Sequence, residues 1–470
     1  MRSRPLTACL AAAVLSATTP SFAAGIQIPF EREQLKNGMT VILHEDHALP
    51  IVVVDITYNV GSRYEAARRT GFAHLFEHLM FMGTDRAPTK KFDAWMEASG
   101  GWNNAGTDED RTEYYDVGPS TILPLVLWLE ADRLRDLGPL MNETKLNAQR
   151  EVVRNERRQR SENEPYGKVE LRLPELLYPE NHPYHHPVIG SHEDLEAATV
   201  PDVKEFFAKW YDPANASLVV AGDFSSKDAL TRIRRYFESI PSRGAPKDPG
   251  APGFEPGVTT LKQTVRETIE DEVELPKVVM AWQSPKHFGP GDAELDLLSN
   301  ALASGKASRL YQALVYDQKL AQSVDASQQS GVLGSRFVVD VIARPGVSLD
   351  KLEAAIDAEL AKVTKEKLRE PELTRAKNTV EAAFVARLQT VRGRAAILNE
   401  YQTELGDPGY AEKDIERYRR ATLDSVQAVA QRTLSPSARV VLRVVPKAKP
   451  PQGGNAKAGA NGADAKGDRK

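Results

Sequence analysis

The residues of this chain best suited to chemistry are those of the segment His74-Leu75-Phe76-Glu77-His78. On a helix, His74 and His78 lie four positions apart and share a face, with Glu77 on the same side. Two imidazoles at this spacing can bind one Zn²⁺, and a neighbouring carboxylate can take a proton from zinc-bound water. The order H-x-x-E-H is the inverse of the zinc motif H-E-x-x-H. The pattern therefore predicts a hydrolytic site with one Zn²⁺ per chain.

The surroundings of the motif favour a buried site. Apart from the three motif residues, every position from 72 to 82 is apolar, and Gly83 gives a stop signal for the helix. A segment of this kind is buried, and buried imidazoles and carboxylates need partners. The alternative, a helix with two solvated surface histidines, fits this context less well.

The first 23 residues have the pattern of a secretory signal peptide. A basic start, Met1 to Arg4, precedes an Ala-rich apolar run over about 6–15, and Ser21-Phe22-Ala23 offers a cleavage site. The apolar run is too short to span a bilayer, and no later segment is long and apolar enough to do so. We therefore predict a mature chain that is periplasmic or secreted, as in Gram-negative bacteria, without membrane insertion.

Composition argues against several other classes of protein. Cys9 is the only cysteine and falls within the predicted signal peptide, so the mature chain has neither disulfides nor thiolate ligands for zinc. The formal net charge of −4 is ordinary for a globular protein and argues against nucleic acid as a partner.

Proline and glycine gather between Pro241 and Gly257, which predicts a linker rather than a packed element. The linker leaves two halves of similar size, and this suggests an internal duplication. The predicted units are a signal peptide over 1–23, a first domain with the zinc motif over 24–240, a linker over 241–258, a second domain over 259–446 and a disordered tail over 447–470.

Hydrophobic periodicity predicts the same kinds of element in both halves. In the first half we expect strands at 39–44, 51–58 and 216–221, with the motif helix after the second strand and a closing helix at 227–240. In the second half we expect strands at 264–270, 277–282 and 438–445, with helices at 292–302, 349–367 and 370–405. Each half is therefore expected to be α+β, an antiparallel sheet with helices on one face. No histidine occurs in 291–303, so only the first half carries the motif.

Together these features resemble the pitrilysin/insulinase family of zinc peptidases. The similarity is to the half-length type, which includes mitochondrial processing peptidase subunits and bacterial secreted relatives, and it covers about residues 34–446. The blocks that carry it are 71–84, 100–115, 150–156, 182–184, 210–215, 219–223 and 305–311. The resemblance implies two homologous domains of the pitrilysin/processing-peptidase type, of which the first is catalytic and the second is not.

The resemblance also implies roles that spacing alone leaves open. Spacing does not choose the third zinc ligand among the many carboxylates, whereas the family pattern makes it Glu156, beside His74 and His78, with Glu77 as the general base. The pattern further puts Asn104, Ala105 and Thr107 on an edge strand beside the zinc, where a peptide substrate adds as an extra strand. An ordinary surface strand is the alternative for these three residues.

This chain departs from the family pattern at three positions. The family's acidic residue seven positions before the distal ligand is Gln149 here, and an Arg and a Tyr of the second half are replaced by Val315 and Gln322. Either nearby residues such as Tyr316 substitute for that pair, or a partner chain supplies the missing groups.

A second group of histidines, His182, His185 and His186, lies between prolines. A second metal site is one reading of it. We expect an irregular structural loop instead.

The implied function is a zinc metalloendopeptidase that hydrolyses peptides or unfolded segments. Full-length relatives enclose their substrate in a four-domain chamber, and this chain supplies two such domains. It is therefore expected to pair, as a homodimer or as a heterodimer with a related subunit. The alternative is a non-catalytic peptide-binding or chaperone subunit of a paired assembly, and the intact set of His74, Glu77, His78 and Glu156 argues against it. A structural zinc protein is disfavoured because such sites usually close with four ligands, often cysteines.

Overall fold

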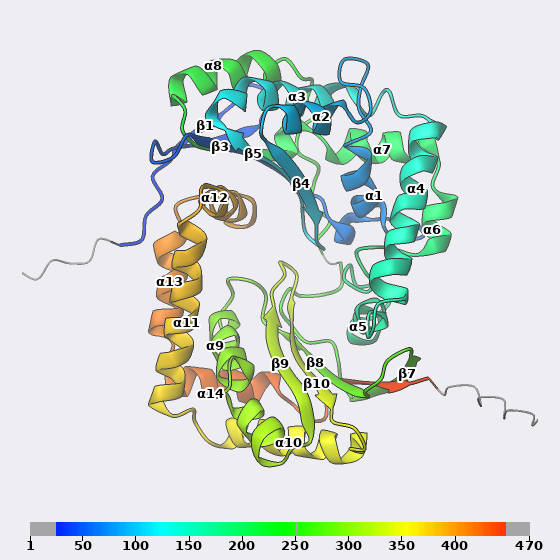
Figure 1. The fold of residues 1–470 in the computed structure, drawn as a ribbon, viewed down its shortest axis with the longest axis vertical. Coiled ribbons are helices and arrows are strands. Elements are labelled where there is room, and N and C mark those ends of the chain that lie inside the picture. Colours follow the sequence, from blue (N-terminus) through cyan, green and yellow to red (C-terminus); the bar gives the residue numbers. More distant parts are fainter. Residues whose placement is uncertain (1–24, 251, 448–470) are drawn as a thin grey trace, which may run out of the picture.

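The computed structural model describes residues 25–250 and 252–447, and it contains two β-sheets, one above the other in the view of Figure 1. The predicted signal peptide over 1–23 and the predicted tail beyond residue 447 lie outside the described residues. The first sheet has the order β1-β2-β6-β3-β5-β4 and the second the order β7-β11-β8-β10-β9. The strands of the first sheet are β1 (Glu31–Gln34), β2 (Thr40–Glu45), β3 (Ile51–Tyr58), β4 (Trp102–Thr107), β5 (Thr112–Pro119) and β6 (Ala216–Gly222). Those of the second are β7 (Val265–Asp271), β8 (Lys277–Ser284), β9 (Ala321–Gln329), β10 (Ser335–Ala343) and β11 (Val440–Pro446).

The two sheets are built on one plan. In each, the last strand of the half pairs in parallel with an early one, β6 with β2 and β11 with β7, while the other neighbours are antiparallel. The predicted α+β fold with two related units is confirmed, but the sheets are mixed rather than wholly antiparallel. Parallel pairing needs a long connection, and nearly the whole of each half lies between the two parallel strands.

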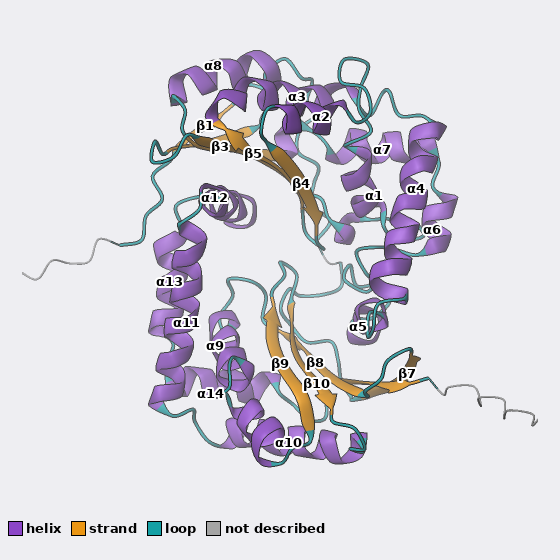
Figure 2. Cartoon of the chain, viewed as in Figure 1, coloured by secondary structure: helices purple, strands orange, loops and turns teal. Residues whose placement is uncertain are grey.

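Helices fill the connections of both halves, as the colours of Figure 2 make clear. The first half contains α1 (Phe72–Leu79), α2 (Lys91–Ala98), α3 (Leu123–Asp136), α4 (Glu143–Arg157), α5 (Lys168–Leu177), α6 (His192–Ala197), α7 (Val200–Trp210) and α8 (Ser226–Phe237). The second contains α9 (Asp292–Ala303), α10 (Leu349–Lys365), α11 (Glu370–Leu388), α12 (Val391–Leu405), α13 (Ala411–Arg420) and α14 (Leu423–Thr433). In the described ranges, none of these helices is both long and apolar enough to cross a bilayer.

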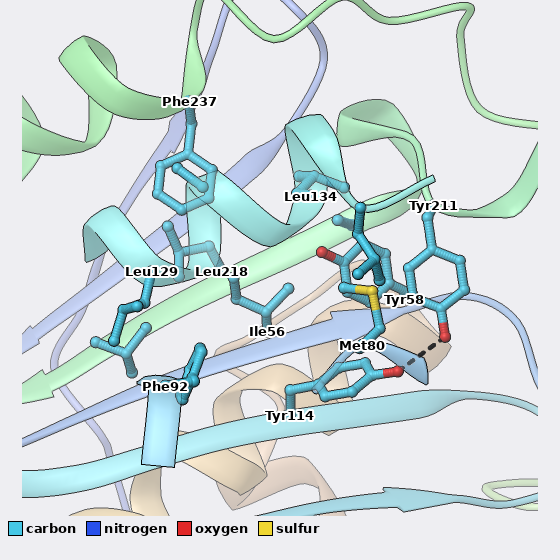
Figure 3. Close-up of a cluster of buried hydrophobic side chains, with 14 of the residues drawn as sticks. Ile56, Tyr58, Met80, Phe92, Tyr114, Leu129, Leu134, Tyr211, Leu218 and Phe237 are labelled. Carbon is cyan, nitrogen blue, oxygen red and sulfur yellow. Dashed lines mark hydrogen bonds between the residues drawn. The ribbon is translucent and has the colours of Figure 1, made fainter. Parts of the chain in front are cut away.

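The main core of the first half lies between its sheet and the helices on one face. Seven of the eight residues of β3 are buried, because β3 is a central strand with β5 and β6 on either side. Tyr58, Tyr114 and Tyr211 meet in this core, and the hydroxyls of Tyr114 and Tyr211 are 2.9 Å apart (Figure 3). The Tyr114 hydroxyl also donates to the Phe76 carbonyl of α1, at 3.4 Å, which ties the motif helix to the sheet.

The opposite face of each sheet is covered by a helix from the other half. Helix α12 packs Val391, Ala395 and Leu398 against sheet residues such as Val53 and Val219. Helix α5 packs Leu173 and Leu177 against Val279 and Leu442 of the second sheet. Figure 1 shows both helices at the junction between the two sheets. The expectation of helices on one face alone therefore describes only the helices of the same half.

Candidate metal centre and active site

Helix α1 presents the three motif residues from a helix that is otherwise part of the core. Phe72, Leu75, Phe76 and Leu79 are buried, and Phe76 stacks on Phe206 of α7 with ring centroids 4.8 Å apart. Since the apolar positions fix the rotation of the helix, the remaining positions must face the other way. One ligand atom from each of His74, Glu77 and His78 lies within 4.8 Å of the other two.

Helix α4 brings Glu156 to the same place. Asn142 caps the start of the helix by accepting a hydrogen bond from the Lys145 amide, and Leu146 and Val153 are buried in the first core. Glu156 follows Val153 by one turn, so burial of Val153 turns the carboxylate towards α1. The Glu156 Oε2 atom lies 3.2 Å from His78 Nε2 and 3.9 Å from His74 Nε2.

The two imidazoles stand at right angles around this carboxylate. Their ring centroids are 4.9 Å apart and their planes meet at 83°. In a tetrahedral zinc site with bonds of about 2.1 Å, ligand atoms are about 3.4 Å apart. The separations of 3.2 and 3.9 Å bracket that value, so the three side chains need little movement to share one ion.

The charge states of these side chains suit metal binding. Burial, together with the nearby His78, lowers the pKa of His74 to about 4, so the ring is neutral at neutral pH, as a metal ligand must be. The hydrogen bond with His78 lowers the pKa of Glu156, which keeps this carboxylate ionised. Arg160 also approaches the second oxygen of Glu156, at 2.6 Å.

Glu77 is held differently from Glu156. Its Oε2 atom accepts a hydrogen bond from the Thr107 hydroxyl, at 2.7 Å. Burial raises the pKa of Glu77, and the Thr107 hydrogen bond opposes that rise. A carboxylate beside a metal site is suited to accept a proton from a bound water and to return it.

The donor set fits a zinc ion. The Nε2 atoms of His74 and His78 both face the Glu156 carboxylate, so each ring offers one nitrogen to a shared ion. Two imidazoles and one carboxylate are also the ligand set of several catalytic zinc sites, which keep a fourth position open.

The predicted substrate residues lie on the outermost strand of the first sheet. Strand β4 pairs with β5 and is last in the strand order, so within the described chain its outer edge has no partner strand. Asn104 and Gly106 are exposed, whereas Ala105 and Thr107 turn towards the side of α1. A Cβ atom at Gly106 would meet nothing within 4 Å, so the space over the exposed face of the strand is open at this point.

The departures from the family pattern have defined places in the structure. The Gln149 amide donates to the Met82 sulfur at 2.8 Å, on the face of α4 that also bears Glu156. Val315 is buried in the core of the second half, and Gln322 is an exposed residue of β9. The side chain of Tyr316 is exposed, at 68%.

The second histidine group lies in an irregular loop, as expected. His182 stacks on Tyr178, with ring centroids 4.6 Å apart, and the His185 Nδ1 atom lies 2.8 Å from the Tyr178 carbonyl. His186 Nδ1 lies 3.7 Å from the buried carboxylate of Glu65. Each ring thus has its own neighbour, and the three do not form a common ligand cluster in the described chain.

Glu65 was not singled out by the sequence pattern. It accepts hydrogen bonds from backbone amides at the start of α1. The sequence does carry one sign that such an acceptor is needed. Gly71 occupies the position before the helix, where a Ser, Thr, Asp or Asn cap would be expected, so the capping group must come from another residue.

The fold and the convergent His, His and Glu side chains are those expected of the zinc-peptidase class. Comparison with family models agrees: "Insulinase (Peptidase family M16)" matches residues 40–189 and "Peptidase M16 inactive domain" matches residues 197–380. The chain belongs to the M16 peptidase family, which confirms the resemblance to insulinase-type peptidases.

Individual relatives are similar over most of the chain. The zinc protease PqqE of Helicobacter pylori is 30% identical over 395 residues, covering 84% of this chain and 87% of that protein. An uncharacterised zinc protease of Streptomyces coelicolor is 26% identical, covering 87% and 89%. Among solved structures, a protease from Helicobacter pylori superposes with a TM-score of 0.82 at 26% identity, covering 89% of this chain and all of that one. The periplasmic protease PqqL of Escherichia coli has a similar fold, with a TM-score of 0.72 at 19% identity, and the match covers 90% of this chain and 48% of that one.

Proposed function

We propose that this chain is a zinc metalloendopeptidase that hydrolyses peptides or unfolded segments. The observation that carries the proposal is the meeting of His74, His78 and Glu156 around one point, with Glu77 beside them. His74, His78 and Glu156 would hold the zinc ion. The names of the relatives, zinc proteases, support the same cofactor.

Binding of the substrate falls to β4. A peptide in extended conformation would pair with the free edge of this strand through main-chain hydrogen bonds, over Asn104, Ala105 and Thr107. Recognition of this kind reads the backbone, so broad specificity follows. It also requires a segment that can become a strand, which favours unfolded substrates.

The chemistry would be shared between Glu77 and its neighbours. A bound zinc ion supplies a Lewis acid that polarises the scissile carbonyl and acidifies water. Glu77 takes the proton of the attacking water and passes it to the leaving amine. The Thr107 hydroxyl orients the Glu77 carboxylate, which is partly buried.

A second candidate is a non-catalytic peptide-binding or chaperone subunit of a paired assembly. One observation favours it: Val315 is core and Gln322 is exposed, so neither position offers the Arg and Tyr of the family pattern. The fold also occurs within a chain of about twice this length, which supports pairing as a homodimer or with a related subunit. A periplasmic or secreted location, suggested by the N-terminal sequence, is part of the proposal.

The test is cleavage of a mixed peptide library by the purified mature chain, with and without a zinc chelator. We expect cleavage that is lost on chelation, restored by zinc and absent in Glu77→Gln. Binding of one zinc per chain without cleavage would favour the non-catalytic subunit. Cleavage that survives both the chelator and the substitution would overturn the proposal.

A further inference from the structure

The helix that carries the candidate site cannot cap itself. Helix α1 has eight residues, and helices this short depend on tertiary contacts for their stability. Its N-cap residue is Gly71, with φ +86°, which provides no side chain to accept from the first amides. A Cβ atom at this position would lie 2.8 Å from the Ile189 carbonyl oxygen and 3.0 Å from the Gly190 Cα. The usual capping residues are therefore excluded, and an acceptor must come from elsewhere.

That acceptor is Glu65, six residues earlier in the chain. Its Oε2 atom accepts from the Gly71 amide at 2.9 Å, and its Oε1 atom accepts from the Ala73 amide at 2.7 Å. The Glu65 side chain is 0% exposed. A buried carboxylate is costly unless it is hydrogen-bonded, and here both oxygens have backbone donors at the positive end of a helix.

The segment that bears Glu65 is itself attached to the substrate strand. Glu65 follows a 3₁₀ turn, Ser62–Tyr64, whose Ser62 and Arg63 amides donate to the carbonyls of Asp108 and Glu109, at 3.1 and 2.9 Å. These carbonyls come directly after Thr107, the last residue of β4. Glu65 thus connects the start of α1 to the end of β4: its carboxylate binds the α1 amides, and the turn just before it binds the two carbonyls after β4.

The same end of α1 is also linked to α4. The Gly190 backbone packs on Gly71, and the Gly190 carbonyl accepts from Arg157, the residue after Glu156. The start of α1 is therefore connected to β4 through Glu65 and to α4 through Gly190.

We propose that Glu65 is a positioning residue for the metal centre: its carboxylate fixes the first turn of α1, and thereby sets His74 against Glu156 and Glu77 against Thr107. The inference rests on the proposed function for its catalytic consequence. Its structural part, the capping of α1, does not depend on activity.

The test compares Glu65→Gln with a matched control, Asp212→Asn. Asp212 is also a buried carboxylate in the first half, and it accepts from two backbone amides, those of Ala214 and Arg243, at 2.8 and 2.6 Å. It holds a turn after α7 and makes no hydrogen bond with α1. Glutamine keeps the length of Glu65, but its amide group can accept only one of the two hydrogen bonds. Both variants lose a carboxylate, so a general loss of stability should affect them alike.

Three readouts separate positioning from general stability. In Glu65→Gln we expect hydrogen exchange at the amides of residues 71–73 to be at least about tenfold faster. Zinc affinity should fall by roughly 10–100-fold, as it does when other residues that hold metal ligands in place are changed. The kcat should fall while KM stays nearly unchanged. In Asp212→Asn these three quantities should equal those of the wild type. Should Glu65→Gln fail to fold, Glu65→Asp, which keeps the charge but shortens the reach, is expected to give intermediate values.

The inference is overturned if Glu65→Gln lowers the thermal midpoint as Asp212→Asn does while exchange at 71–73 and zinc affinity stay at wild-type values. Failure of the proposed function has a different signature. The wild type would then bind zinc without cleaving peptides, while zinc affinity and exchange would still distinguish the two variants.

Discussion

Two carboxylates lie beside the two imidazoles, and they differ in what holds them. One oxygen of Glu156 faces both His74 and His78, whereas Glu77 is held by the Thr107 hydroxyl. This difference is the reason for proposing Glu156 as the metal ligand and Glu77 as the group that transfers the proton. It also makes the two roles separable, because a ligand sets affinity for the ion whereas a base sets the rate.

We expect Glu156→Gln and Glu77→Gln to lose activity for different reasons. Glu77→Gln should retain one zinc per chain and lose roughly 10²–10⁴-fold in kcat, the usual contribution of a general base. Glu156→Gln should lose more zinc affinity than the roughly 10–100-fold typical of an outer-shell change. Zinc content after dialysis, measured alongside single-turnover rates, checks both. If Glu156→Gln kept its zinc and Glu77→Gln lost it, the two roles would have to be exchanged.

The sequence reveals these residues unequally. His74, Glu77 and His78 follow from helical spacing, because all three are on one turn and a half of the chain. Glu156 is 78 residues beyond His78 and lies on a helix rich in charge, so only the family resemblance distinguishes it. Glu65 escapes both approaches, since its role is to bind main-chain amides and leaves no motif.

At the scale of elements, β4 is the strand on which the proposed chemistry and the proposed substrate binding meet. Thr107, at its end, donates to Glu77, while Asn104 is exposed on the other face of the strand. If the strand binds the substrate backbone, the side chain of Asn104 matters little and the hydroxyl of Thr107 matters much. Because successive side chains of a strand point to opposite faces, one face of β4 would serve the chemistry through Thr107, while the backbone of the same strand would pair with substrate.

The corresponding prediction compares Thr107→Val with Asn104→Ala. Valine has the shape of threonine without the hydroxyl, and hydrogen bonds to charged groups are worth about 1.5–3 kcal/mol, so kcat should fall by roughly 10–150-fold. Asn104→Ala should change kcat/KM by less than about tenfold, since main-chain pairing is retained. Steady-state kinetics on one unfolded substrate checks both variants. A larger effect at Asn104 than at Thr107 would argue for recognition by side chains.

Helices α1 and α9 show how the two halves diverged. Both begin after a glycine with positive φ, Gly71 at +86° and Gly291 at +104°. Counting from these glycines, the positions of Glu77 and His78 correspond to Leu297 and Leu298, which are buried in the second core. The absence of histidine from 291–303 predicts that the second half has no such motif, whereas the prediction of one helix over 370–405 is wrong, because the structure has α11 and α12 there. The second helix starts anew because Thr390 caps it by accepting from the Gly393 amide.

The junction of α9 and α13 should make stability depend on pH. Asp296 accepts from the Tyr418 hydroxyl at 2.8 Å, and burial, followed by the charge of Asp292, raises its pKa to about 7. The folded state then binds the proton more tightly than the unfolded state, so this group's contribution to the free energy of unfolding declines as pH rises from about 4 to about 7. Asp296→Asn keeps an acceptor for Tyr418 and removes this decline. We expect the variant to gain stability over the wild type between about pH 5 and pH 8, as judged by denaturant midpoints.

The control for this prediction is Asp317→Asn, since Asp317 is exposed. Its midpoints should follow those of the wild type at every pH. Parallel curves for Asp296→Asn and the wild type would show that Asp296 titrates as an ordinary aspartate.

At the scale of the whole molecule, the two halves depend on each other because α5 and α12 each cover the sheet of the other half. Helix α12 covers one face of the first sheet and brings Asn399 and Arg392 to the buried Asp55, at 2.6 and 2.9 Å. Local periodicity can predict a helix, as it does over 370–405, but it does not say which sheet the helix covers. A sequence divided at the linker suggests two independent domains, whereas the packing makes one unit.

We therefore expect the linker to be dispensable once the chain has folded. Gly244 lies in an exposed stretch, and a Cβ atom there would meet nothing within 4 Å, so a protease site inserted after it should be accommodated. After cleavage at that site, the two fragments should elute together and keep the thermal midpoint and zinc content of the intact chain. Size-exclusion chromatography and calorimetry of the nicked protein make the measurement.

The sharper form of this prediction adds Arg392→Ala to the nicked protein. Removing the arginine leaves Asp55 buried with less compensation, a change that typically costs about 3–5 kcal/mol. In the nicked protein this loss falls on the contact that holds the fragments together, so they should separate at a much lower denaturant concentration. Arg387→Ala is the control on the neighbouring helix, because the Arg387 side chain is half exposed and its ion pair with Glu400 should contribute little. Fragments that separate on nicking alone would show that the linker, rather than the exchanged helices, holds the two halves in place.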